Sequence, residues 1–120
     1  MYKYSFEKLE VWNEAKELSK SIYQITSSFP EDEKFGLTSQ LKRASIPICS
    51  NIAEGSARKT NKDKAHFTVI AFSSAVEVLN QIILAFEFNL ISEEDYIKLR
   101  EKIESITNKL NALRNHQINK

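Results

Sequence analysis

Apolar residues along the chain recur at steps of three and four, the spacing that places side chains on one face of an α-helix. The first stripe predicts a helix that begins near Ser5 or Phe6 and ends before Pro30. Its members are Leu9, Trp12, Ala15, Leu18, Ile22, Ile25 and Phe29. The period of this stripe, close to 3.5 residues, is typical of an amphipathic helix with one buried face.

The last stripe predicts a helix that starts after Ser92, with Asp95 three positions on, a sequence close to a capping box. Its members are Tyr96, Leu99, Ile103, Ile106, Leu110 and Leu113. The mostly polar tail that follows, residues 114–120, is expected to fray, as the ends of a chain commonly do.

A helix with a proline in its middle is predicted from about Phe35 to Gly55. Its apolar face is Leu41, Ala44, Ile48 and Ile52. Pro47 has no amide hydrogen and its ring crowds the carbonyl of Arg43, at a cost of roughly 3 kcal/mol. We expect a kink at Pro47, and a glycine cap in the left-handed conformation at Gly55.

The third helix, expected over residues 62–90 with Thr60 or Asn61 as its N-cap, has two apolar faces. One face is Val69, Phe72, Val76, Leu79, Ile83, Phe86 and Leu90. The other is Ala71, Ala75, Val78, Ile82 and Ala85. Two alternatives follow: either the chain itself covers both faces, or one face packs against another subunit.

Short connections join these four helices, and the chain of 120 residues contains only two glycines and two prolines. Together these features predict an all-α protein, an antiparallel up-down-up-down four-helix bundle with a proline-kinked second helix. Residues 1–120 are expected to form one domain, since this length suffices for a single core.

The net charge of +1 is unevenly distributed along the chain. Residues 1–34 carry −2, residues 35–66 carry +4 and residues 67–120 carry −1. The candidate nucleic-acid-binding residues are the basic ones of the middle segment: Lys42, Arg43, Arg58, Lys59, Lys62 and Lys64. No aromatic residue lies between Phe35 and Phe67, so phosphate contacts rather than base stacking are expected to dominate any binding.

No pattern of catalytic residues is present, so we predict no enzymatic activity and no cofactor or metal. Nothing places His66 or His116 beside Cys49, and a small core residue is the simpler interpretation of this cysteine. The chain lacks a glycine-rich phosphate loop and the paired Glu-x-x-His motifs of di-metal bundles. A single cysteine, no secretory signal and no apolar run of about 18 residues predict a cytoplasmic protein without a membrane span.

Polar residues also occur within the apolar pattern of the second and third helices. They share one face on each helix: Arg43, Pro47, Asn51 and Glu54, then Ser74 and Glu77. A hydrogen-bond network that fixes how the helices meet, a ligand pocket and a contact between subunits all remain open for this set.

Three segments carry a resemblance to a known family: "FEKLEVWNEAKEL", "FPEDEKFGLTSQLKRASIPICSNIAEG" and "SSAVEVLNQI". With them, nearly the whole chain resembles the four-helix-bundle proteins encoded in intervening sequences of bacterial 23S ribosomal RNA genes. One departure is Ser73, where the family pattern usually has glycine.

The resemblance implies an antiparallel four-helix bundle that assembles as a ring, commonly a homopentamer, with no established enzymatic activity. The family is also similar in fold to the accessory variability determinant of diversity-generating retroelements, which implies nucleic-acid or ribonucleoprotein partners. Two functions follow as hypotheses. The first is an RNA-associated assembly protein that uses the basic segment. The alternative is a ring-shaped scaffold for protein–protein interaction without nucleic-acid binding.

Overall fold

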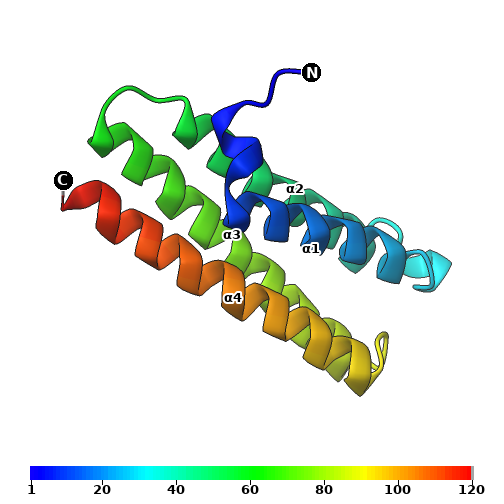
Figure 1. The fold of residues 1–120 in the computed structure, drawn as a ribbon. Helices are drawn as coiled ribbons and strands as arrows, with labels where there is room; N and C mark the ends of the chain where they lie inside the picture. The colour runs from blue at the N-terminus through cyan, green and yellow to red at the C-terminus, as the bar shows by residue number, and fades with distance from the viewer. Residues whose placement is uncertain (120) are drawn as a thin grey trace.

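Four long helices follow one another in the computed structural model, which describes residues 1–119, and no strand occurs among these residues. They are α1 (Glu10–Thr26), α2 (Leu37–Ser56), α3 (Asn61–Glu87) and α4 (Glu93–Ile118). Two short 3₁₀ helices, η1 (Ser5–Lys8) and η2 (Glu31–Glu33), precede α1 and α2. Figure 1 shows successive helices running in opposite directions along an elongated body of 46 × 31 × 23 Å. The all-helical, four-helix prediction is confirmed.

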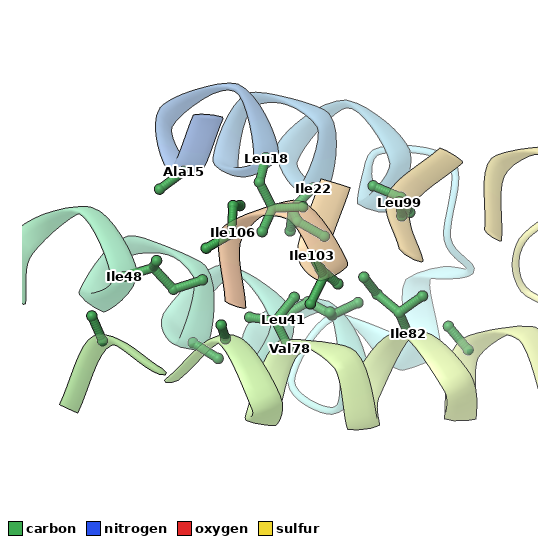
Figure 2. Packing of buried hydrophobic residues seen from close by; sticks show 14 of the residues in the cluster. Ala15, Leu18, Ile22, Leu41, Ile48, Val78, Ile82, Leu99, Ile103 and Ile106 are labelled. Carbon is green, nitrogen blue, oxygen red and sulfur yellow. The ribbon is translucent and has the colours of Figure 1, made fainter. Parts of the chain in front are cut away.

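Each helix packs against two others, so that the bundle is a square in which α1 and α3 occupy opposite corners. The pairs in contact are α1 with α2, α2 with α3, α3 with α4 and α4 with α1. Leu18 and Ile22 of α1 point into the centre toward Ile103 and Ile106 of α4 (Figure 2). All four of these side chains are completely buried, which makes them the middle of one continuous core.

The first helix begins later than its apolar stripe predicted. Residues 5–8 form the 3₁₀ turn η1, Leu9 is extended, and α1 starts only at Glu10. Polar groups stabilise this break: the Glu7 carboxylate accepts from the Tyr4 amide at 2.8 Å, and the Asn13 side-chain amide donates to the Glu7 and Leu9 carbonyls. The prediction of a start near Ser5 or Phe6 is therefore wrong, although Leu9 and Trp12 still pack on the core.

The predicted caps of the last two helices are confirmed. The Thr60 hydroxyl accepts from the Asp63 amide at 3.1 Å, and the Ser92 hydroxyl accepts from the Asp95 amide at the same distance. Each bond satisfies an amide that the first helical turn leaves free. Between these helices Asn89 takes a positive φ of 61°, a conformation that asparagine tolerates better than most residues.

α2 continues through Pro47 without an interruption of the helix. The side-chain amide of Asn51 donates to the Pro47 carbonyl at 2.8 Å. The bend expected at Pro47 stays a prediction.

Gly55 lies inside α2 and its φ is not positive, so the predicted left-handed glycine cap is wrong. The reason for glycine is the close approach of α3. A Cβ on Gly55 would lie 2.9 Å from the Cβ of Phe67, closer than real contacts allow. The absence of a side chain at residue 55 therefore sets the distance between α2 and α3 at this end of the bundle.

The two apolar faces of α3 differ in burial. The inner face consists of residues that are at most 1% exposed: Ala71, Ala75, Val78, Ile82 and Ala85. On the other face Val69 is 42% and Val76 is 45% exposed, while Phe72, Leu79 and Phe86 are half-buried against the chain's own core. The chain itself therefore covers the first face fully and the second in part, and a contact of the second face with another subunit stays a prediction.

By length and composition α3 could cross a membrane, and it is the one such helix among the described residues. Core helices of soluble proteins satisfy the same criterion, and α3 packs on both α2 and α4. The absence of a membrane span stays a prediction.

A charged cluster joins α1 to α4. Lys109 of α4 donates to the Glu14 carboxylate and lies 2.9 Å from the Glu10 carboxylate, while the Ser105 hydroxyl also donates to Glu14. Partial burial raises the pKa of the Glu14 carboxyl, but the hydrogen bonds from Lys109 and Ser105 outweigh it and leave the pKa below its ordinary value of 4.5.

Replacing Gly55 with alanine should destabilise the protein. Alanine improves helix propensity by up to about 1 kcal/mol, but overpacking against Phe67 costs about 1–3 kcal/mol. Thermal unfolding of Gly55→Ala, compared with Gly36→Ala, measures the effect. A Cβ on Gly36 would lie 3.1 Å from the Glu33 carboxylate, at the end of a flexible side chain, and at the ordinary contact distance of 3.8 Å from the Glu33 carbonyl oxygen. A higher melting temperature for Gly55→Ala would contradict this account of the α2–α3 contact.

The Glu14 cluster should make stability depend on pH. A carboxyl whose pKa is lower in the folded state stabilises the protein above its unfolded pKa, and that stabilisation is lost as pH falls through the folded pKa. Glu14→Gln should therefore melt a few degrees below the parent at pH 7, and this difference in melting temperature should shrink as pH falls below the ordinary value of 4.5 and vanish below the lowered folded-state pKa of Glu14. Glu17→Gln, at an exposed neighbour, serves as the control. A difference in melting temperature between Glu14→Gln and the parent that is the same at neutral and at acidic pH would contradict a lowered pKa of Glu14 in the folded state.

Candidate nucleic-acid interface

Four of the six candidate basic residues gather around the connection between α2 and α3. Arg58 and Lys59 lie in the loop, and Lys62 and Lys64 lie in the first turn of α3. Arg58, Lys59 and Lys62 are exposed, whereas Lys64 is half-buried. None of the four pairs with a carboxylate within 4.0 Å in the part of the chain that the structure describes. We refer to Arg58, Lys59, Lys62 and Lys64 as the basic end.

Lys42 and Arg43 lie elsewhere, near the opposite end of α2. At 1.5 Å per residue, Lys42 is about 21 Å along the helix from its end at Ser56. Both line a shallow groove of about 610 Å³ on α1 and α2, together with Tyr23, Phe35 and Ile46. The six cations lie close together in the sequence, but the length of α2 separates them into two groups. One is the basic end, and the other is Lys42 with Arg43.

Aromatic rings lie beside these cations although the sequence places none between them. The Arg58 guanidinium lies 4.5 Å from the centre of the Phe67 ring, and the Lys42 ammonium lies 4.9 Å from that of Tyr23. Such cation–π contacts stabilise the orientation of the cation over the ring. The sequence gives no sign of these contacts, because Phe67 and Tyr23 lie on other helices and no spacing along the chain reveals the pairing.

A cavity of about 240 Å³ opens beside the basic end. It is bounded by the end of α2, the start of α3, the end of α4 and the segment around η1. Lys64 belongs to both the basic end and this cavity, which His116 and Gln117 of α4 close on another side. The predicted fraying of residues 114–120 is wrong for the described part, because α4 remains helical to Ile118 and Gln117 is buried. Residue 120 lies outside the described residues.

The polar set predicted to form a network does not join α2 to α3 within the described chain. Arg43 donates to the Ser39 hydroxyl at 3.1 Å and Asn51 donates to Pro47, so both bonds stay within α2. Glu54 and Glu77 are exposed, and Ser74 is half-buried without a hydrogen bond to α2. The network interpretation is therefore wrong for a single chain, and a role of these residues between subunits stays a prediction.

The residues with reactive side chains are not arranged for catalysis. The Cys49 sulfur lies 4.0 Å from the Trp12 carbonyl oxygen and packs against the core, as predicted, and burial raises the pKa of its thiol. A raised pKa disfavours the nucleophilic thiolate. Among the described residues no group of His, Cys, Asp or Glu side chains could hold a metal ion.

The outer face of α3 exposes apolar side chains to solvent. It consists of Val69, Val76 and Leu84, which are 42%, 45% and 37% exposed, with Ser73 and Glu77 beside them. Ser73, where the resembled family usually has glycine, is also exposed on this face. The three apolar residues lie about two helical turns apart on one side of α3, which makes this side a candidate contact surface for another protein.

Comparisons with known proteins agree with this architecture. The model of the 23S rRNA-intervening sequence protein family matches residues 7–112. A solved structure of a protein of unknown function from the S23 ribosomal protein family of Bacteroides thetaiotaomicron is similar in fold, with a TM-score of 0.78 and 21% identity. The match covers 87% of this chain and 97% of that one. No curated protein matches the chain.

Proposed function

Because the chain belongs to the family of 23S rRNA-intervening sequence proteins, we propose that it is a non-enzymatic, self-assembling protein that binds RNA through its basic end. The observation that carries this proposal is the gathering of four cations without carboxylate partners around one loop. The cytoplasm, where RNA is accessible and a lone cysteine stays reduced, is the proposed setting.

The chemistry of the basic end favours phosphate contacts. Lysine and arginine on an exposed loop neutralise phosphates and release counterions, which makes affinity fall steeply with salt and depend weakly on sequence. The rings near Arg58 and Lys42 are each covered by a cation on one side. Shape and charge therefore account for binding at this surface better than base stacking does.

Self-assembly would multiply a weak contact. Charges more than about 10 Å apart are largely screened at 0.1 M salt, so a single basic end attracts RNA only modestly. In a ring each subunit repeats the same four cations, and one RNA molecule touching several of them gains apparent affinity by about 10²-fold or more. A homopentamer is the assembly that we propose, and the family resemblance supplies that number.

The outer face of α3 is the proposed contact between subunits. Val69, Val76 and Leu84 expose apolar surface that a second copy would remove from water, at roughly 25 cal/mol for each Å² buried. The same face supports the alternative function, a ring-shaped scaffold for another protein without RNA binding. The two functions share the assembly and differ only in whether the basic end binds RNA.

Neutralising the basic end should abolish RNA binding and leave the assembly intact. The test variant is Arg58→Gln, Lys59→Gln and Lys62→Gln together, which removes three exposed cations and keeps Lys64. Its matched control, Lys16→Gln, Lys20→Gln and Lys98→Gln, removes the same charge from exposed sites on α1 and α4. Fluorescence anisotropy with a labelled RNA, repeated at several salt concentrations, measures the loss in affinity. It also gives the slope of log affinity against log salt concentration, which should become shallower by about one unit for each phosphate contact removed.

Two results would contradict the RNA proposal. If the parent binds no RNA at low salt, the basic end is solvated surface and the scaffold function is favoured. If the test and control variants lose affinity equally, binding depends on net charge alone and not on the basic end.

Charging the outer face of α3 should dissociate the assembly without unfolding the subunit. Val76→Glu places a carboxylate at a side chain that is 45% exposed in the single chain, so the subunit's own core is unaffected. Ile97→Glu is the matched control, because Ile97 is 47% exposed on α4. Light scattering should give the monomer mass for Val76→Glu and the assembly mass for Ile97→Glu and the parent. A parent that is monomeric at micromolar concentration would contradict self-assembly.

A further inference from the structure

The cavity beside the basic end has a buried interior and an exposed mouth. Ile52, Thr68 and Gln117 form its inner wall and are 4%, 4% and 8% exposed. At the mouth His116 and Asn61 are exposed. Its volume of about 240 Å³ lies below the roughly 300–1,000 Å³ of pockets for drug-sized ligands, so it suits one small molecule or group.

The inner wall carries a polar pair that the bundle core does not require. The Thr68 hydroxyl lies 2.8 Å from Gln117 Oε1 and 3.1 Å from the Lys64 carbonyl oxygen. With one proton, it donates to one of the two at a time. When Thr68 donates to Gln117, the amide group of Gln117 keeps both of its hydrogens for another acceptor. The bond from Thr68 therefore holds the side-chain oxygen of Gln117 in place, and the NH₂ group of Gln117 can donate to a ligand in the cavity.

The remaining lining combines apolar surface with positive charge. Leu9, Ile52 and Leu113 supply the apolar part, and Lys64, a member of the basic end, is the lysine of the lining. Among the described residues that line the cavity there is no aspartate or glutamate, so no carboxylate of the wall repels an anion. Apolar faces, a carboxamide at the inner end and a cation near the basic end match the three parts of a nucleotide: the ring faces, the ring edge and the phosphate.

We propose that this cavity binds one unstacked nucleotide, with its base between the apolar side chains, the base edge on Gln117 and the phosphate at Lys64. The inference rests on the proposed RNA binding at the basic end, and it adds a preference for single-stranded RNA. In a duplex the base edges are paired and stacked, so a base reaches such a cavity only when it is splayed out. The source of the nucleotide is either a residue of an RNA strand or a free nucleoside monophosphate.

Nuclear magnetic resonance tests the cavity without RNA. Titration with each of the four ribonucleoside 5′-monophosphates should shift the side-chain NH₂ signal of Gln117 and the backbone signal of Thr68, saturably at millimolar concentration. Inorganic phosphate and ribose, added separately, should leave the Gln117 side-chain signal in place. If no nucleotide shifts that signal, or if phosphate shifts it equally, the cavity does not bind a base and the proposal is overturned.

Two variants of Gln117 and one control test whether the nucleotide-induced shift depends on the Gln117 side chain. Gln117→Leu removes the carboxamide, while Thr68 still donates to the Lys64 carbonyl, so no buried hydroxyl is left unpaired. Gln117→Glu keeps the shape and still accepts from Thr68, but its carboxylate has no hydrogen to donate to the base edge. The control Gln81→Leu makes the same change at a buried glutamine on α3, about 20 Å along the helix from Thr68. Both Gln117 variants should lose the nucleotide-induced shift of Thr68, and Gln81→Leu should retain it.

The second measurement compares a single-stranded RNA with the duplex formed by the same strand. Gln117→Leu should weaken single-strand binding about tenfold and leave duplex binding unchanged, whereas the triple variant of the basic end should weaken both. Equal binding of Gln117→Leu and the parent to the single strand would overturn the role of the cavity in RNA binding while the basic end stands. Nucleotide shifts in a parent that binds no RNA would instead support a free-nucleotide site and contradict the proposed function.

Discussion

The rest of the structure depends on the small side chains that let α3 pack closely against its neighbours. Ala71, Ala75 and Ala85 are at most 1% exposed and give α3 a thin buried face, and Gly55 of α2 meets Phe67 where no Cβ fits. Close packing of this kind maximises contact between helices. Val78 and Ile82 are completely buried and complete this inner face, while the other large apolar side chains of α3 lie on its flanks or on its outer surface. Phe86 stacks on Tyr96 of α4 with ring centres 4.6 Å apart, and Val69 and Val76 remain partly in solvent.

This constraint connects the fold to both proposed interfaces. On the side of α3 away from the core, Val69 and Val76 belong to the exposed apolar surface that we propose a second copy covers. At the start of α3, the tight α2–α3 contact at Gly55 brings the basic loop beside the end of α4 (Figure 1). There Gln117 of α4 bonds to Thr68 of the neighbouring helix α3 and lines the cavity. The proposed assembly surface therefore lies along α3, and the proposed RNA-binding end lies at the start of α3 and in the loop before it.

Much of the fold could be predicted from the sequence because burial repeats with the helical period. The four stripes, the caps at Thr60 and Ser92 and the core position of Cys49 followed from local spacing alone. The extended conformation of Leu9 could not, because it depends on side-chain hydrogen bonds made by Glu7 and Asn13. An apolar pattern contains no information on such bonds.

The candidate site was predicted less completely, since it depends on which helices meet. A run of basic residues gave no sign that Lys42 lies on the far part of α2, or that Phe67 and Tyr23 supply rings to cations from other elements. Gln117 was missed for a related reason. The polar tail looked free to fray, and nothing along the sequence shows that Gln117 is buried and bonded to Thr68 of α3.

The central claim is that the outer face of α3 is covered by another copy of this chain, and thiol labelling at Ser73 tests it most directly. Ser73→Cys, made in a Cys49→Ala background, places a single thiol on a surface that is exposed in the isolated subunit. Glu101→Cys, at an exposed site on α4, gives the reference rate. We predict slow labelling at residue 73 in concentrated protein and a rate that rises to the reference on dilution. Labelling as fast as at residue 101 at every concentration would contradict the claim.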